Sequence, residues 1–221
     1  METLLTLALT AAAGFLLARY MTLVYSGKVP LFTKITGRLT GRSADQTMDW
    51  KEYAGAVLKL HILGLFALGM ILLFQNYAPL NPARLPGLPW HLAFNTAASF
   101  VTNTNWQAYS GESTLSYFSQ MVGLGVQNFL SAASGMAIAV ALSRAIAGHT
   151  GKIGNFWTDL TNSLLFILLP LSSFLALILV SQGVVQNFSD YLTTTSGQVI
   201  PGGPAASQVA IKQLGTNGGG F

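Results

Sequence analysis

Two stretches of this sequence decide its fold: residues 89–107 read PWHLAFNTAASFVTNTNWQ, and residues 205–220 read AASQVAIKQLGTNGGG. Each begins as an apolar run of about 10–14 residues, which is too short to cross a bilayer and is typical of a re-entrant segment. Each run then meets an uncharged polar string, which starts at Thr102 in the first stretch and at Gly215 in the second. The pattern predicts two half-helices, each followed by a polar turn.

The composition places these stretches in a membrane. Of 221 residues, 11 are Lys or Arg and 7 are Asp or Glu, so 8% are charged, against about 25% in an ordinary soluble domain. The absence of cysteine excludes a disulfide scaffold, a thiolate zinc site and a cysteine nucleophile. The cations are sorted by loop and do not form the dense stripe that nucleic acid binding needs. We expect an integral membrane protein with no nucleic acid partner.

Four longer apolar segments reach the roughly 20 residues that a transmembrane helix needs. They are Thr3–Val24, Tyr53–Phe74, Tyr117–Leu142 and Trp157–Val180. In the first segment Glu2 precedes the apolar run and Arg19 follows it, which is the reverse of the order in a signal peptide. We therefore interpret this segment as an uncleaved first helix.

The loop charges predict the orientation. Most cations fall in the two loops after the first and third spans: Arg19, Lys28, Lys34, Arg38, Arg42, Lys51, Arg144 and Lys152. The opposite side carries only Arg84 and Lys212. Because cytoplasmic loops are enriched in Lys and Arg, we expect the amino terminus outside and the basic loops in the cytoplasm. The stretch Lys28–Arg42 either lies on anionic headgroups or touches a cytoplasmic partner domain.

The order of segments divides this all-α membrane protein into four parts. We expect an extra N-terminal transmembrane helix in residues 1–25 and a basic cytoplasmic segment in 26–52. A first helix–pore loop–helix repeat follows in 53–146, and 147–221 begin a second repeat and end in its pore loop.

The polar turns have the chemistry of a site for a monovalent cation. The carbonyl end of each half-helix carries partial negative charge, and carbonyl and amide oxygens in the turn can replace an ion's hydration shell. Glycines from Gly218 onward can take positive φ, so that successive carbonyls point to one side. Thr104, Asn105, Thr216 and Asn217 add neutral oxygens, whereas acidic side chains would be expected for Ca²⁺ or Mg²⁺. A glycine-rich polar string is equally typical of a flexible loop, so the residues alone leave both readings open.

Longer runs around these turns resemble a known family. Phe100–Gln120, Gln127–Gly135 and residues 206–221 resemble the pore loops, and the helix after the first loop, of the bacterial potassium-transporting ATPase A subunit of the Kdp system. Pro79–Pro82 and Leu85–Leu88 match as well. The resemblance covers nearly the whole chain and is weakest over the first 45 residues.

The resemblance implies a potassium-channel-like fold with four pore-loop repeats around one filter. It implies a subunit of the bacterial inner membrane that takes K⁺ from the periplasmic side and passes it to a P-type ATPase B subunit. That partner hydrolyses ATP, so no catalytic residue and no cofactor are expected here, and a C subunit and a small F subunit complete the complex. By position, the K⁺-binding filter residues are Thr102, Asn103, Thr104, Asn105, Gln107, Thr216, Asn217 and Gly218. Their backbone carbonyls are the expected ligands, and the Asn105 and Gln107 side chains shape the site and its mouth.

The sequence ends at Phe221, inside the second pore loop, whereas the family continues through two more repeats. We therefore expect that this chain alone forms no filter and gives no K⁺-selective rubidium flux in liposomes. The alternative function is a non-conducting truncated fragment or accessory membrane component. Glu112 and Asp159 lie near the ends of predicted helices, where we expect them to be solvated.

Overall fold

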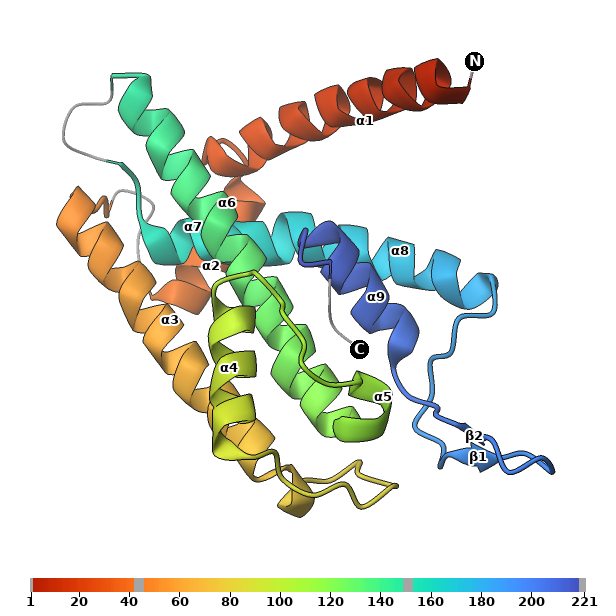
Figure 1. The fold of residues 1–221 in the computed structure, drawn as a ribbon. Coiled ribbons are helices and arrows are strands. Elements are labelled where there is room, and N and C mark those ends of the chain that lie inside the picture. The colour runs from red at the N-terminus through yellow and green to blue at the C-terminus, as the bar shows by residue number, and fades with distance from the viewer. Residues whose placement is uncertain (1, 42–45, 149–152, 219–221) are drawn as a thin grey trace.

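The computed structural model describes residues 2–41, 46–148 and 153–218, and these residues are mostly helical. The helical elements are α1 (Glu2–Tyr25), α2 (Pro30–Thr40), α3 (Trp50–Leu73), the 3₁₀ turn η1 (Gln75–Tyr77), α4 (Trp90–Val101), α5 (Gly111–Thr114), the π-helical η2 (Ser119–Gly125), α6 (Val126–Ile146), α7 (Phe156–Asn162), the π-helical η3 (Ser163–Leu168), α8 (Leu169–Ser181) and α9 (Ala205–Leu214). A short antiparallel hairpin, β1 (Leu192–Thr193) with β2 (Val199–Ile200), precedes α9. Figure 1 shows α4 lying between α3 and α6, and α9 lying beside α8.

Four helical stretches are long and apolar enough to cross a membrane. They are α1, α3, the continuous η2–α6 stretch (Ser119–Ile146) and the continuous α7–η3–α8 stretch (Phe156–Ser181). They confirm the four spans predicted from hydropathy, with ends that differ by a few residues. The two short helices α4 and α9 confirm the predicted half-helices.

Helices α3 and α7 begin side by side. Asp49 caps α3, because its carboxylate accepts the N–H of Glu52 while the Glu52 carboxylate accepts the N–H of Asp49. Asn155 caps α7 by accepting the N–H groups of Trp157 and Thr158. Between these caps, Met48 donates its N–H to the carbonyl oxygen of Gly154 at 2.7 Å. The segments that lead into α3 and α7 are therefore joined by backbone hydrogen bonds.

Two clusters of buried apolar side chains hold α4 and α6 in place. One joins α3, α6 and α7, and its members include Tyr53, Ala133, Ala137, Phe156 and Leu168. The other joins α3, α4 and η2 through Leu68, Leu72, Ala97, Phe100 and Leu124. Glycine at 123 permits this second contact, because a Cβ there would lie 3.0 Å from the Leu68 side chain.

The first helix stands apart from this body, as Figure 1 shows. Nearly all of its side chains are exposed, which suits a helix surrounded by lipid. Only its C-terminal end is anchored: the Tyr20 hydroxyl donates to the carbonyl oxygen of Phe166 at 2.6 Å, and Tyr25 bonds to Ser163.

Asp159 corrects an expectation from the sequence. Glu112 is exposed, as predicted, but Asp159 is only 2% exposed. Its carboxylate accepts two hydrogen bonds from the Arg144 guanidinium, at 2.6 and 2.9 Å, and a third from the Tyr53 hydroxyl at 3.2 Å. The prediction of a solvated Asp159 was wrong because the sequence does not reveal that the end of α6 folds back onto the start of α7. A buried carboxylate needs such a partner.

Candidate functional site: two polar turns behind short helices

The backbone alternates in the same way after both short helices. Asn103 and Asn105 have φ values of 63° and 54°, at the second and fourth positions after the end of α4. Thr216 and Gly218 have φ values of 59° and 78° at the same two positions after α9. Non-glycine residues with positive φ are uncommon, and such conformations cluster at functional sites. Alternation between left-handed and ordinary conformations turns successive carbonyls toward the same side of the strand.

The N–H groups of both turns point back toward their own helices. Thr104 donates its N–H to the carbonyl oxygen of Ser99 at 3.0 Å, and Asn217 donates to that of Lys212 at 3.0 Å. These two hydrogen bonds are equivalent, because each spans five residues from the turn into the last turn of the preceding helix. They satisfy carbonyls that a helix end leaves without an internal partner. The N–H groups of Thr104 and Asn217 are thus occupied by the preceding helices.

Side-chain amides join the two turns to each other. Asn105 donates from Nδ2 to the carbonyl oxygen of Asn217 at 3.2 Å, and Asn103 donates to that of Gly215 at 3.5 Å. The Asn217 amide returns a hydrogen bond to Oδ1 of Asn103. The two predicted filter segments, which lie more than 100 residues apart in the sequence, therefore run side by side.

Ser131 on α6 forms hydrogen bonds with both turns. The Ser131 hydroxyl donates to Oδ1 of Asn103 at 3.0 Å and lies 3.4 Å from the amide nitrogen of Asn217. Sequence reasoning missed Ser131. The signal was available, because polar residues recur on one face of an apolar helix at Asn128, Ser131 and Ser134, and polar residues at such positions mark functional faces.

Buried oxygens without a partner accompany this network. Asn105 and Asn217 are 5% and 6% exposed, and within the described part of the chain the Oδ1 atoms of both accept no hydrogen bond. Buried polar atoms are nearly always satisfied by protein, water or an ion. The paired turns therefore have unused neutral acceptors at their centre.

An open cavity of about 460 Å³ adjoins the turns on the side of the middle of α6. Its polar lining comprises Thr102, Asn103, Thr216, Ser131, Ser134 and His61. His61, another residue that sequence reasoning did not assign to this place, is half-buried on α3 with Nδ1 2.8 Å from the carbonyl oxygen of Val57. Among the described residues, this lining offers hydroxyl, amide and imidazole groups and no carboxylate.

The predicted site residues fall into two places. Thr102, Asn103, Asn105, Thr216 and Asn217 meet at the paired turns, and Gly218 continues the second turn. The Thr104 hydroxyl remains within its own turn, where it donates to the carbonyl oxygen of Ser99 at 3.0 Å.

Gln107 lies beside Tyr109. Burial raises the pKa of the Tyr109 phenol to about 12. Tyr109 is therefore neutral at physiological pH. Gly219, Gly220 and Phe221, which belong to the second polar string, lie outside the described residues.

The oxygens of this site are neutral. Within the residues that the structure describes, no three His, Asp, Glu or Cys side chains come together in the way that a divalent metal site needs. Backbone carbonyls, hydroxyls and amides instead suit a cation that sheds its water easily.

Comparison with known proteins agrees with this chemistry. The chain matches the model of the family described as "Potassium-transporting ATPase A subunit" over residues 4–221. It is similar to proteins named "Potassium-transporting ATPase potassium-binding subunit". One from Pseudomonas aeruginosa is 55% identical, with 97% of this chain and 40% of that protein aligned. One from Leptospira interrogans is 56% identical over 90% of this chain and 37% of its own length. One from Sorangium cellulosum is 51% identical over 100% of this chain and 42% of its own length. The chain thus spans about two fifths of the length of these relatives.

Proposed function

Because the chain belongs to the potassium-transporting ATPase A subunit family, we propose that it supplies two strands of a K⁺ filter in an ATP-driven uptake complex. K⁺ enters from the periplasmic side of the bacterial inner membrane, with the amino terminus of the chain outside. The ion then passes to a P-type ATPase B subunit, which hydrolyses ATP, in a complex completed by C and F subunits. The filter residues are those of the paired turns, with Gln107 at the mouth.

One observation carries the proposal: the equivalent left-handed residues after α4 and α9. Asn103 matches Thr216 and Asn105 matches Gly218 in both position and φ. A single turn of this shape has many explanations, but two such turns that lie side by side favour a repeated filter. Their carbonyl oxygens can replace the hydration shell of a monovalent cation, as in channel filters.

The cavity beside the turns can receive the ion when it leaves the filter. Its hydroxyl-bearing lining at Thr102, Ser131 and Ser134 can solvate a cation without binding it tightly. Conduction requires that an ion be held well enough to enter and weakly enough to leave. A cavity lined by hydroxyl and amide groups behind an uncharged filter meets both conditions.

The proposal is tested with a matched pair of glycines in the assembled complex. Gly218 and Gly197 have φ values of 78° and 82°, and neither has an atom within 4 Å of an added Cβ. Valine is strongly disfavoured at such φ values, so Gly218→Val and Gly197→Val impose the same local strain. Gly218→Val should reduce ATP-driven rubidium uptake at least tenfold, whereas Gly197→Val, in the hairpin, should leave it intact. Equal uptake by both variants would refute the proposal.

A further inference from the structure

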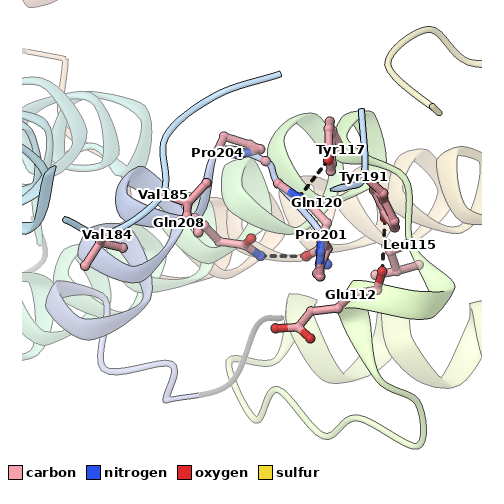
Figure 2. A pocket seen from close by; sticks show the side chains of 13 residues that line it. Glu112, Leu115, Tyr117, Gln120, Val184, Val185, Tyr191, Pro201, Pro204 and Gln208 are labelled. Carbon is pink, nitrogen blue, oxygen red and sulfur yellow. Dashed lines mark hydrogen bonds between the residues drawn. The ribbon is translucent and has the colours of Figure 1, made fainter. Parts of the chain in front are cut away.

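The segment between α8 and α9 contacts the first repeat at Tyr117 and Glu112 before it enters α9. It carries the β1–β2 hairpin, and it lines a cavity of about 220 Å³ together with Glu112, Tyr117 and Gln120. Figure 2 shows this pocket, with Tyr117 and Tyr191 close together on its wall. The first repeat is therefore in direct contact with the chain that leads into the second half-helix.

Tyr117 is the centre of this contact. Its own N–H donates to the carbonyl oxygen of Leu80 at 3.1 Å, which fixes the residue to the loop before α4. Its hydroxyl donates to the carbonyl oxygen of Ser189 at 3.0 Å and accepts the N–H of Gly202 at 3.1 Å. Its ring stacks on Tyr191 with 5.8 Å between centroids. One side chain thus binds both the outgoing and the returning arm of the hairpin segment.

The returning arm passes against the face of this ring. Gly203 has a φ of +116°, and a Cβ built there would lie 3.0 Å from the Tyr117 ring. The Asn187 side chain accepts the N–H of Gly203 at 3.1 Å and so ties the two arms together. The entry to α9 is therefore shaped directly by Tyr117.

The start of α9 is capped by the outgoing arm. Ala206 donates its N–H to the carbonyl oxygen of Val185 at 2.9 Å, and Ser207 donates to Oε1 of Gln186 at 2.9 Å. These are N–H groups that a helix start leaves without internal partners. A displacement of this arm consequently moves the helix itself.

A second contact holds α9 within its first turn. Nε2 of Gln208 donates to Oε1 of Gln120 at 2.9 Å, and both side chains are buried. Figure 2 shows the two amides directed toward each other. Gln120 lies in η2, three residues after Tyr117, so one short stretch of the first repeat holds α9 at two points.

We propose that Tyr117 is a positioning residue of the K⁺ filter: by fixing the entry of α9, it sets where the Thr216–Gly218 strand lies against Asn103 and Asn105. The inference rests on the proposed function. α9 is a rod of about 15 Å, so a tilt at its start moves the strand at its end. Ion sites tolerate displacements of only about 0.5 Å.

Tyr117→Phe tests this in the assembled complex, because it removes the hydroxyl and keeps the ring. It should raise the K⁺ concentration for half-maximal ATPase activity severalfold, leave the maximal rate nearly unchanged and reduce discrimination between K⁺ and Rb⁺. Tyr191→Phe is the matched control: it removes a hydroxyl that donates to the carbonyl oxygen of Glu112, and it leaves the hydrogen bonds of Tyr117 to Ser189 and Gly202 in place. It should leave the K⁺ dependence, the maximal rate and the discrimination between K⁺ and Rb⁺ unchanged. A variant Y117F with the parent's K⁺ dependence and selectivity would overturn the inference.

A distance measurement tests the structural step independently of transport. The chain has no native cysteine, so spin labels can be placed at the exposed residues Tyr77 and Ser196. Tyr117→Phe should broaden the distribution of distances between them, and an unchanged distribution would also overturn the inference. The two failures are separable. A parent complex with no K⁺ response refutes the proposed function, whereas a responsive parent with an equally responsive Y117F variant overturns only the role of Tyr117.

Discussion

The Asn105 side chain donates a hydrogen bond to the backbone carbonyl oxygen of Asn217 at 3.2 Å, and so joins the turn after α4 to the turn after α9. The same carbonyl row is the proposed K⁺ ligand, so this bond sets the spacing of two filter strands. Because Asn105 is 5% exposed, a water molecule does not readily replace its side-chain amide when this amide is removed.

Asn105→Ala should therefore weaken K⁺ binding. Loss of one such hydrogen bond costs about 1 kcal/mol, which corresponds to roughly a fivefold higher K⁺ concentration for half-maximal ATPase activity of the complex. Asn95→Ala is the control, because this substitution removes the same amide from an exposed position on α4. Equal K⁺ dependence in the two variants would show that the bond does not shape the site.

Gln107→Arg should place a permanent positive charge at the mouth of the filter. Repulsion of an incoming cation is worth about 1–4 kcal/mol at close range, depending on the local dielectric. We expect the apparent K⁺ affinity to fall at least about fivefold, and the effect to shrink at high ionic strength because salt screens exposed charges. K⁺ titration of ATPase activity measures both. Gln198→Arg adds the same charge to the exposed hairpin and should change little; equal behaviour of both variants would count against the placement of Gln107.

Asp159→Asn should destabilise the fold without acting on the filter. The change leaves the Arg144 guanidinium without its carboxylate partner, and breaking a buried pair in this way costs about 3–5 kcal/mol. Thermal unfolding of the purified protein in detergent measures the loss. Asp190→Asn, at an exposed position in the segment before α9, should leave the unfolding temperature within error. The double substitution of Arg144→Met with Asp159→Leu should recover much of the loss, since it removes both charges together.

Gly87→Ala should disrupt the junction between α3 and α4. Leu88 donates its N–H to the carbonyl oxygen of Leu72 at 3.0 Å, and this holds Gly87 so close to α3 that a methyl group would overlap the carbonyl oxygen of Leu73. Because backbone cannot move aside as a flexible side chain can, we expect a loss of about 1–3 kcal/mol. Gly69→Ala is the control, because a Cβ there meets nothing within 4 Å. A Gly87→Ala variant as heat-stable as Gly69→Ala would contradict this geometry.

The elements of the fold follow closely from local sequence. The length of the apolar runs separated α4 and α9 from the four long spans, because about 10–14 residues cannot cross a bilayer. The uncharged strings after these helices also indicated the composition of the candidate site. Both signals are local and need no knowledge of the tertiary structure.

The contacts between distant segments did not follow from the sequence. Nothing in the order of residues shows that Ser131 reaches Asn103 and Asn217, or that Arg144 covers Asp159. Likewise, the sequence shows Tyr117 only as an aromatic residue near a helix start. Its hydrogen bond with the N–H of Gly202 appears only in the folded structure. Such pairings depend on how helices pack, and single-residue patterns do not encode packing partners.

The position of a bound ion tests the proposed K⁺ filter most directly. Crystals of the assembled complex soaked with Tl⁺, a heavy analogue of K⁺, would locate monovalent cations by anomalous scattering. We predict a peak within coordination distance of backbone carbonyl oxygens in both Thr102–Asn105 and Gly215–Gly218, and we expect that added K⁺ competes with Tl⁺ and removes this peak. Strong Tl⁺ peaks elsewhere in the complex, with both turns empty, would contradict it.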